Sequence, residues 1–171
     1  MSTGLLVPVS EYLGKTYHPD CEYVEGVLLE RNVGELSHGR AQTVLAAYVL
    51  YRVAGFWAVV EVRVQVKAER FRIPDVSIVR GGMPAGRIIT APPEVAVEVL
   101  SPDDRMSDVQ DKIDDYLGFG VSCVWIIQPE SGRAWVHTNE ESREVKDGVL
   151  RNPAGDLVIP LEAIFGQFTP R

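Results

Sequence analysis

Glu98 is an acidic residue inside an otherwise apolar segment, EVAVEVLSP at residues 94–102. If this segment is a strand, alternation puts Glu98 on the same face as Ala96 and Leu100. A lone ionised carboxylate kept from water is costly, so it must be neutralised or matched with a cation. We therefore expect Glu98 to have an arginine, a lysine or a bound metal ion as its partner.

Two further residues are placed to meet Glu98. Asp75 is a second acid in a largely apolar segment, FRIPDVSIV at residues 71–79, and it can converge with Glu98 if the two segments are neighbouring strands. Lys112 borders the apolar stripe of a helix that is expected over residues 101–120. Its ammonium can therefore reach the two carboxylates while its alkyl stem stays in the core.

Two carboxylates and a lysine allow two interpretations. Hard oxygen ligands without thiolates suit Mg²⁺ or Mn²⁺, and such an ion beside an ammonium can activate a water for phosphodiester hydrolysis. The same three residues can also form a structural ion network that ties the helix to the sheet. The sequence leaves both interpretations open at this point.

The charge balance bears on a nucleic-acid partner. The chain has a formal net charge of −7, which by itself argues against phosphate binding. Residues 31–90, however, hold nine Lys and Arg against four acids, so a basic middle could face a polyanion such as DNA. Scattered, solvated charges would give the same count, and this alternative stays open as well.

Length and composition indicate a single domain over residues 1–171. Apolar residues make up 46% of the chain and charged residues 24%, which are ordinary values for a globular protein. No apolar run reaches the roughly 20 residues of a membrane helix, and no signal-peptide pattern is present, so we expect a cytoplasmic protein. Cys21 and Cys123 fit neither a disulfide framework nor a zinc site.

The first half of the chain predicts a hairpin and two further strands. CEYVEGVLLER at 21–31 has two strand-like halves around a Glu-Gly pair, which suits a tight turn. The segment 57–70 alternates as one strand, and 71–79 is expected to pair antiparallel with it, with Pro74 near a strand end, an edge or a bulge. The core face of the first of these strands is expected to contain Val60, Val62, Val64 and Val66.

Two helices are expected. The first covers 37–55, where Ser37 can cap the start and a glycine ends the helix. Its apolar stripe is predicted to contain Val44, Leu45, Tyr48 and either Tyr51 or Arg52. The second covers 101–120 and carries acids in its first turns, where the helix dipole favours them. Its apolar stripe is predicted to contain Met106, Val109, Ile113 and either Tyr116 or Leu117.

The order of these elements predicts an α/β fold with a mixed sheet. The strand 94–100, the helix 101–120 and the apolar strand 121–128 form a strand–helix–strand step, which gives a parallel pair. The strand 132–138 follows after a turn, and short strands are expected in the remainder of the chain. Helices are then expected to flank a sheet that also contains antiparallel pairs.

Four stretches together resemble a known family. They are CEYVEGVLLE at 21–30, IPD at 73–75, PPEVAVEVLSPDDR at 92–105 and DKIDDYLGFGVSCVWIIQPESG at 111–132. In type and spacing they are similar to the Uma-type putative restriction endonucleases, within the PD-(D/E)XK nuclease superfamily, over roughly residues 10–165. The resemblance implies a restriction-endonuclease-like core at about 21–138, with flanking helices and an N-terminal β-hairpin.

The resemblance also implies roles for particular residues. Asp75 corresponds to the acid of the PD element and Glu98 to the acid of the (D/E)XK element, so both would bind the metal, joined by the backbone carbonyl of Val99. The lysine that the superfamily places two residues after the acid is Leu100 here. Lys112 on the following helix is the expected replacement.

Two further candidates are His38 and Glu61. The family usually has a histidine near the start of its first helix, and His38 matches it; this residue could assist at the metal or bind phosphate, or be an ordinary helix-cap histidine. Glu61, on the polar face of the strand predicted over 57–70, is either a further metal ligand or a solvated acid, whereas Tyr116 is assigned to packing. The implied function is that of a Mg²⁺- or Mn²⁺-dependent DNA endonuclease, with a non-catalytic nucleic-acid- or protein-binding module of the same fold as the alternative. Exposed sheet edges make a homodimer the expected assembly.

Overall fold

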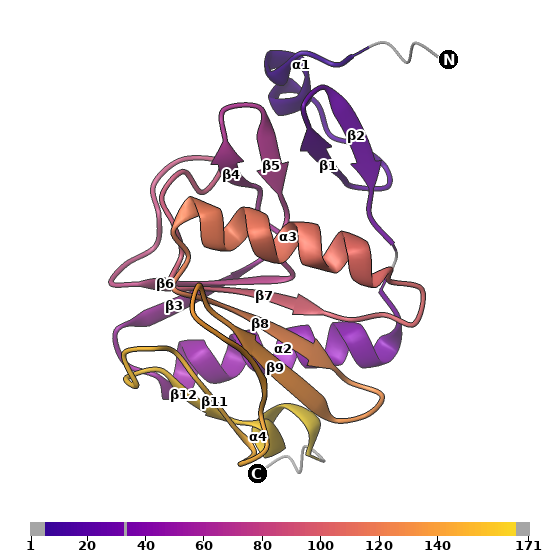
Figure 1. Ribbon diagram of the computed structural model, residues 1–171. Helices are drawn as coiled ribbons and strands as arrows, with labels where there is room; N and C mark the ends of the chain where they lie inside the picture. Colours follow the sequence, from indigo (N-terminus) through magenta and orange to yellow (C-terminus); the bar gives the residue numbers. More distant parts are fainter. Residues whose placement is uncertain (1–5, 33, 167–171) are drawn as a thin grey trace.

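The computed structural model describes residues 6–32 and 34–166, which form four helices and two main sheets (Figure 1). In chain order the elements are α1 (Val9–Gly14), β1 (Cys21–Val24), β2 (Val27–Glu30), α2 (Leu36–Arg52), β3 (Phe56–Val60), β4 (Val64–Lys67), β5 (Arg70–Arg72), β6 (Val76–Arg80), β7 (Val95–Val99), α3 (Met106–Phe119), β8 (Cys123–Gln128), β9 (Arg133–His137), β10 (Ser142–Glu144), β11 (Val149–Arg151), β12 (Val158–Pro160) and α4 (Leu161–Phe165).

The larger sheet has six strands in the order β10-β9-β8-β7-β6-β3. Its central pair, β7 and β8, is parallel and is joined through α3, while the other pairs are antiparallel. The strand–helix–strand step predicted over 94–128 and the neighbouring positions of β6 and β7 are thereby confirmed. The fold is the mixed α/β arrangement expected from the sequence.

The smaller sheet has four strands in the order β2-β1-β5-β4. Its hairpin β1–β2 turns at Glu25 and Gly26, which both have positive φ angles, of 50° and 92°. This is the conformation that a two-residue turn requires. The predicted hairpin is therefore present, and it supplies half of a second sheet.

The long strand predicted over 57–70 is wrong. The strand is interrupted at Glu61, which has a φ of 53°, so β3 belongs to the larger sheet and β4 to the smaller one. The segment 71–79, expected as its partner, is likewise interrupted near Pro74, between the end of β5 and the start of β6. The expected antiparallel pairing survives in two pieces, since β3 pairs with β6 and β4 pairs with β5. As a result Val60 is exposed instead of facing the core.

The elements stack in layers, with a helix on each face of the six-stranded sheet (Figure 1). α2 packs on one face in a core that includes Leu45, Val49 and Val97. α3 packs on the other face, and its apolar side chains also contact β4 of the smaller sheet. α3 therefore lies between the two sheets, and both can deliver side chains to it.

Both predicted helices are present with different ends. α2 starts at Leu36 without a side-chain cap, so the capping role expected of Ser37 is wrong, and Tyr51 is exposed. α3 starts at Met106, which is exposed and not part of the stripe, and ends at Gly120 in the left-handed conformation. Across residues 6–32 and 34–166, no helix combines the length and the apolar character needed to cross a membrane.

Candidate functional site

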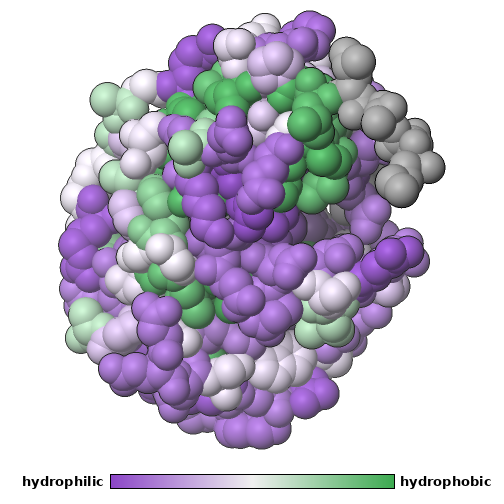
Figure 2. All heavy atoms as spheres, turned by 45° about the horizontal axis from the view of Figure 1, so that its top comes forward, coloured by the Kyte–Doolittle hydropathy of each residue, from purple (hydrophilic) through white to green (hydrophobic). Residues whose placement is uncertain are grey.

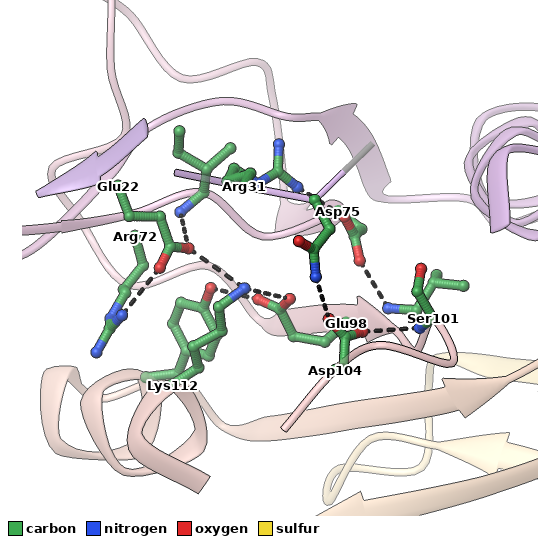
Figure 3. A network of polar contacts seen from close by, with 12 residues as sticks. Glu22, Arg31, Arg72, Asp75, Glu98, Ser101, Asp104 and Lys112 are labelled. Atoms are coloured by element: carbon green, nitrogen blue, oxygen red, sulfur yellow. Dashed lines mark hydrogen bonds and ion pairs between the residues drawn. The ribbon is translucent and has the colours of Figure 1, made fainter. Parts of the chain in front are cut away.

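A cavity of about 540 Å³ opens where the smaller sheet, α3 and the ends of β6 and β7 meet. Five of the residues predicted from the sequence line it, namely His38, Asp75, Glu98, Val99 and Lys112. Figure 3 shows the side chains of Asp75, Glu98 and Lys112 close together, with Glu22 and Arg72 of the smaller sheet beside Lys112. In the space-filling view of Figure 2, hydrophilic side chains cover much of this side of the molecule. The structure therefore brings the predicted acids and the lysine to one place.

Asp75 directly precedes β6 and is buried. Its Oδ2 accepts a hydrogen bond from the backbone N–H of Val99 at 2.7 Å. Its Oδ1 lies 2.8 Å from the Arg31 guanidinium and 3.3 Å from Nε2 of His38. Burial acts to raise the pKa of Asp75, but the hydrogen bond and charge of His38, the N–H of Val99 and the Arg31 charge outweigh it, so the pKa lies below its usual value.

Glu98 lies in β7, on the face that α3 covers, and it is buried as well. Its Oε2 accepts a hydrogen bond from Nζ of Lys112 at 2.9 Å, and its Oε1 accepts one from the Tyr116 hydroxyl at 2.6 Å. Burial raises the pKa of Glu98 to about 7; the Lys112 charge opposes this rise, and the charges of Asp75 and Glu22 add to it. Glu98 is thus an acid that can bind or release a proton near neutral pH.

Lys112 and Tyr116 are four residues apart on α3, so they point from one face of the helix towards β7. Burial disfavours the charged form of Lys112, but Glu98 and Glu22 outweigh that effect and raise its pKa. The assignment of Tyr116 to packing is incomplete, because its ring is buried while its hydroxyl binds Glu98. Leu100, where the superfamily pattern has a lysine, packs instead against the apolar cluster on the α3 side.

The remaining candidate ligand, Glu61, does not line this cavity. Its side chain is exposed; it accepts a hydrogen bond from Gln42 at 3.3 Å and lies 3.9 Å from the Arg31 guanidinium. Glu61 is linked to the side chain of Asp75 through Arg31. It is also linked to the backbone carbonyl of Asp75, which accepts hydrogen bonds from Gln42 at 2.9 Å and from the backbone N–H of Glu61 at 3.3 Å. His38, by contrast, is held on both ring nitrogens, by Asp75 at 3.3 Å and by the Ser101 hydroxyl at 3.3 Å.

Two charged residues that contact the predicted acids and lysine directly, Glu22 and Arg31, were missed in the sequence. Glu22, on β1, is buried and accepts hydrogen bonds from Arg72 at 2.9 Å and from the backbone N–H of Ile73 at 3.0 Å. It had the same signal as Glu98, an acid between buried neighbours of a strand. Arg31 contacts Asp75 across 44 residues of sequence, and nothing in its local sequence predicts that contact.

The cavity carries more acidic than basic side chains, since nine carboxylates and five Lys or Arg line it. Many cations of the basic segment 31–90 are engaged by acids instead of facing solvent freely. The ion pairs that show this are Arg31–Asp75, Lys67–Asp115, Arg70–Asp115, Arg72–Asp115 and Arg80–Asp156. An acidic cavity attracts a small cation and repels a polyanion.

The donor chemistry of the site fits Mg²⁺ or Mn²⁺. Among the residues described here, no cluster of three or more His, Cys, Asp or Glu forms a ready-made metal centre. Mg²⁺ does not need one, because it is usually held by one or two carboxylates, with water and substrate phosphate completing the shell. Asp75 and Glu98 supply that number of carboxylates, although Arg31 and Lys112 now bind the oxygens that an ion would share.

Comparisons with known proteins agree with the family resemblance predicted from the sequence. The family model of Uma2, described as a putative restriction endonuclease, matches residues 11–168. Among solved structures, the chain is similar to that of a putative nuclease belonging to DUF820 from Anabaena variabilis, with a TM-score of 0.75 and 22% sequence identity over 92% of this chain and 98% of that one. No curated protein matches the sequence. These matches confirm the predicted resemblance and the predicted fold class.

Proposed function

The chain belongs to the Uma2 family of putative restriction endonucleases, and from this premise we propose that it is a divalent-metal-dependent nuclease that hydrolyses phosphodiester bonds in DNA. One observation carries the proposal: the buried acids Asp75 and Glu98, from adjacent strands, line one cavity together with Lys112. A divalent metal ion held by such acids would neutralise charge on a phosphate and lower the pKa of a bound water.

In this proposal Asp75 and Glu98 hold the ion, and the backbone carbonyl of Val99 is the third candidate ligand. Asp75 is suited to the task because its pKa is lowered, which keeps it ionised at neutral pH. Tyr116 fixes one oxygen of Glu98 and leaves the other to Lys112. The two acids are therefore oriented before any ligand arrives, as an efficient site requires.

Lys112 and His38, which both line the cavity, supply positive charge to it. The Lys112 ammonium lies 2.9 Å from Glu98, where it can stabilise the negative charge that develops on a phosphate during hydrolysis. The hydrogen bond and charge of Asp75 raise the pKa of His38, against the effect of burial, so His38 carries more positive charge near neutral pH than a free histidine. It is then a candidate phosphate contact.

The experiment that tests the proposal is cleavage of supercoiled plasmid and of single- and double-stranded oligonucleotides with Mg²⁺, Mn²⁺ or EDTA. We expect cleavage only with a divalent ion, loss of cleavage in Asp75→Asn and Glu98→Gln, and a strongly lowered but measurable rate of cleavage in Lys112→Met. Glu61→Gln, which changes an acid outside the cavity, is the matched control. Cleavage that persists in both Asp75→Asn and Glu98→Gln would trace the activity to a contaminant and end the proposal.

A second candidate is a non-catalytic binding module with the same fold. The observation that favours it is that the carboxylate oxygens of Asp75 and Glu98 already have partners within the protein, as in a purely structural network. Calorimetry with Mn²⁺ separates the two functions. If the protein is a non-catalytic module, calorimetry should detect no heat of metal binding, and Lys112→Met should change stability alone. If it is a nuclease, the wild type should bind Mn²⁺ and Glu98→Gln should abolish that binding.

A further inference from the structure

We infer that Glu22 is a positioning residue that holds the ammonium of Lys112 at the site. This inference rests on the proposed nuclease function and adds to it an acid from the smaller sheet. Nζ of Lys112 lies between two carboxylates, 2.9 Å from Oε2 of Glu98 and 3.4 Å from Oε1 of Glu22. Figure 3 shows the lysine reaching from α3 into the space between them.

Glu22 is held firmly enough to fix another group. It is 3% exposed, and both of its oxygens have donors on the protein besides Lys112. The backbone N–H of Ile73 donates to Oε1 at 3.0 Å, and Arg72 donates to Oε2 at 2.9 Å. A buried carboxylate with this set of bonds has little freedom, and it can hold a nearby ammonium by ion pairing.

The contacts form a ring that returns to α3. Arg72, which holds Glu22, is itself bound by Asp115 through Nε at 2.8 Å and through a second guanidinium nitrogen at 2.7 Å. Asp115 follows Lys112 by three residues on α3, so the two lie on one side of the helix. The ring Lys112–Glu22–Arg72–Asp115 thus places the ammonium relative to both β1 and the helix that carries it.

Glu22 matters most when a divalent ion occupies the site. The ion would attract the charge of Glu98 and repel the neighbouring ammonium, which weakens the one other carboxylate contact that Lys112 makes within residues 6–32 and 34–166. Glu22 is tied to the smaller sheet and keeps its contact regardless. A merely structural link between β1 and α3 would be complete with Arg72 and Asp115; the contact of Glu22 with Lys112 is additional to it.

The first test observes the Lys112 ammonium directly, without metal or DNA. In the ¹⁵N-labelled protein, the side-chain ammonium signal of Lys112 reports how fast its protons exchange with water. We expect exchange to quicken by about tenfold in Glu22→Gln, because the variant removes one of the two ion pairs that hold the ammonium. Glu25→Gln is the matched control, because Glu25 lies on the same hairpin and also pairs with an arginine, Arg70, at 2.6 Å.

The second test measures coupling in the active protein. In Mn²⁺-supported cleavage, Glu22→Gln is expected to lower kcat with KM little changed, and to have no further effect in a Lys112→Met background. Equal ammonium exchange in Glu22→Gln and Glu25→Gln, or additive effects of Glu22→Gln and Lys112→Met on kcat, would overturn the inference. If Glu22→Gln does not fold, Glu22→Asp, which keeps the charge on a shorter stem, is measured in its place.

These two tests keep separate the failure of the inference and that of the proposed function. If the wild-type chain cleaves nothing with any divalent ion, the nuclease proposal fails, yet the ammonium signal still decides whether Glu22 holds Lys112. If cleavage is observed and the exchange rate of Lys112 does not respond to Glu22→Gln, the positioning role alone is rejected.

Discussion

The backbone N–H of Val99, at the end of β7, donates a hydrogen bond to Oδ2 of Asp75, which directly precedes the neighbouring strand β6, at 2.7 Å. Val99 directly follows Glu98, so this bond fixes one site acid to the backbone that carries the other. The convergence of the two carboxylates therefore depends on strand pairing and not on flexible side chains alone. Replacing Asp75 is then expected to affect folding as well as activity.

Asp75→Asn is predicted to destabilise the protein by about 3 kcal/mol, the usual effect of breaking a buried charged pair. The three groups around Asp75, namely Arg31, His38 and the N–H of Val99, all act as donors when His38 is protonated. An amide NH₂ group placed there would face a donor in either orientation. Urea unfolding measures the loss, and the exposed Glu61→Gln control should shift the free energy of unfolding by less than about 0.5 kcal/mol. A similar loss in both variants would contradict the argument.

The raised pKa of Glu98 predicts that the free energy of unfolding falls between about pH 4.5 and pH 7. Burial raises its pKa to about 7 in the folded state, so the folded protein keeps a proton that the unfolded chain has released. Its contribution is fully present below the unfolded pKa and is lost as the pH rises through the folded pKa. The loss over this interval is about 3 kcal/mol by linkage. The lowered pKa of Asp75 acts in the opposite direction, and its contribution is lost as the pH falls through the acid range.

Glu98→Gln tests this pH dependence in the absence of metal. The variant cannot titrate at that position, so its free energy of unfolding should fall less between pH 4.5 and pH 7 than that of the wild type. Urea unfolding at a series of pH values in EDTA gives the curve. Glu130→Gln, an exposed acid outside the cavity, should retain the wild-type curve. Parallel curves for Glu98→Gln and the wild type would show that Glu98 is ionised throughout.

Arg31→Met is predicted to tighten Mn²⁺ binding by roughly tenfold, even if it weakens folding. Arg31 lies 2.8 Å from Oδ1 of Asp75 and therefore competes with a metal ion for the same carboxylate. Removing the guanidinium removes both the competition and a nearby positive charge. Calorimetry gives the dissociation constants, and Arg52→Met, which removes the same charge outside the cavity, serves as the control. Unchanged or weaker Mn²⁺ binding in Arg31→Met would rule out competition.

Several features of the fold could be predicted because local sequence determines them. The Glu-Gly turn of 21–31 requires positive φ angles, and the order of strand, helix and strand over 94–128 allows few arrangements. The alternation in 94–100 placed Glu98 opposite the core of valines, and in the structure Glu98 does face α3. The meeting of Asp75, Glu98 and Lys112 followed from these local patterns.

The rest depends on contacts between distant segments. Alternation alone could not show that the backbone turns at Glu61, because Val60 and Val62 continue the apolar pattern across the break. That break creates the second sheet, and with it the position of Glu22 beside Lys112. The choice of metal, DNA as the substrate, a homodimer and a cytoplasmic location stay predictions.

DNA binding is predicted to require a divalent ion. Carboxylates outnumber Lys and Arg around the cavity, so the site repels a phosphate backbone until a cation reduces its negative charge. A fluorescent duplex should bind at least about tenfold more tightly with Ca²⁺, a hard ion that takes the same oxygen ligands, than in EDTA at equal ionic strength.

The gain in affinity with Ca²⁺ should disappear in the Asp75→Asn and Glu98→Gln double variant, whose cavity has lost two negative charges. That variant should instead bind DNA more tightly than the wild type in EDTA, because its repulsion is permanently reduced. If wild-type affinity is the same with Ca²⁺ and with EDTA, DNA does not approach through this cavity, and the basic groups elsewhere in residues 31–90 become its candidate contacts.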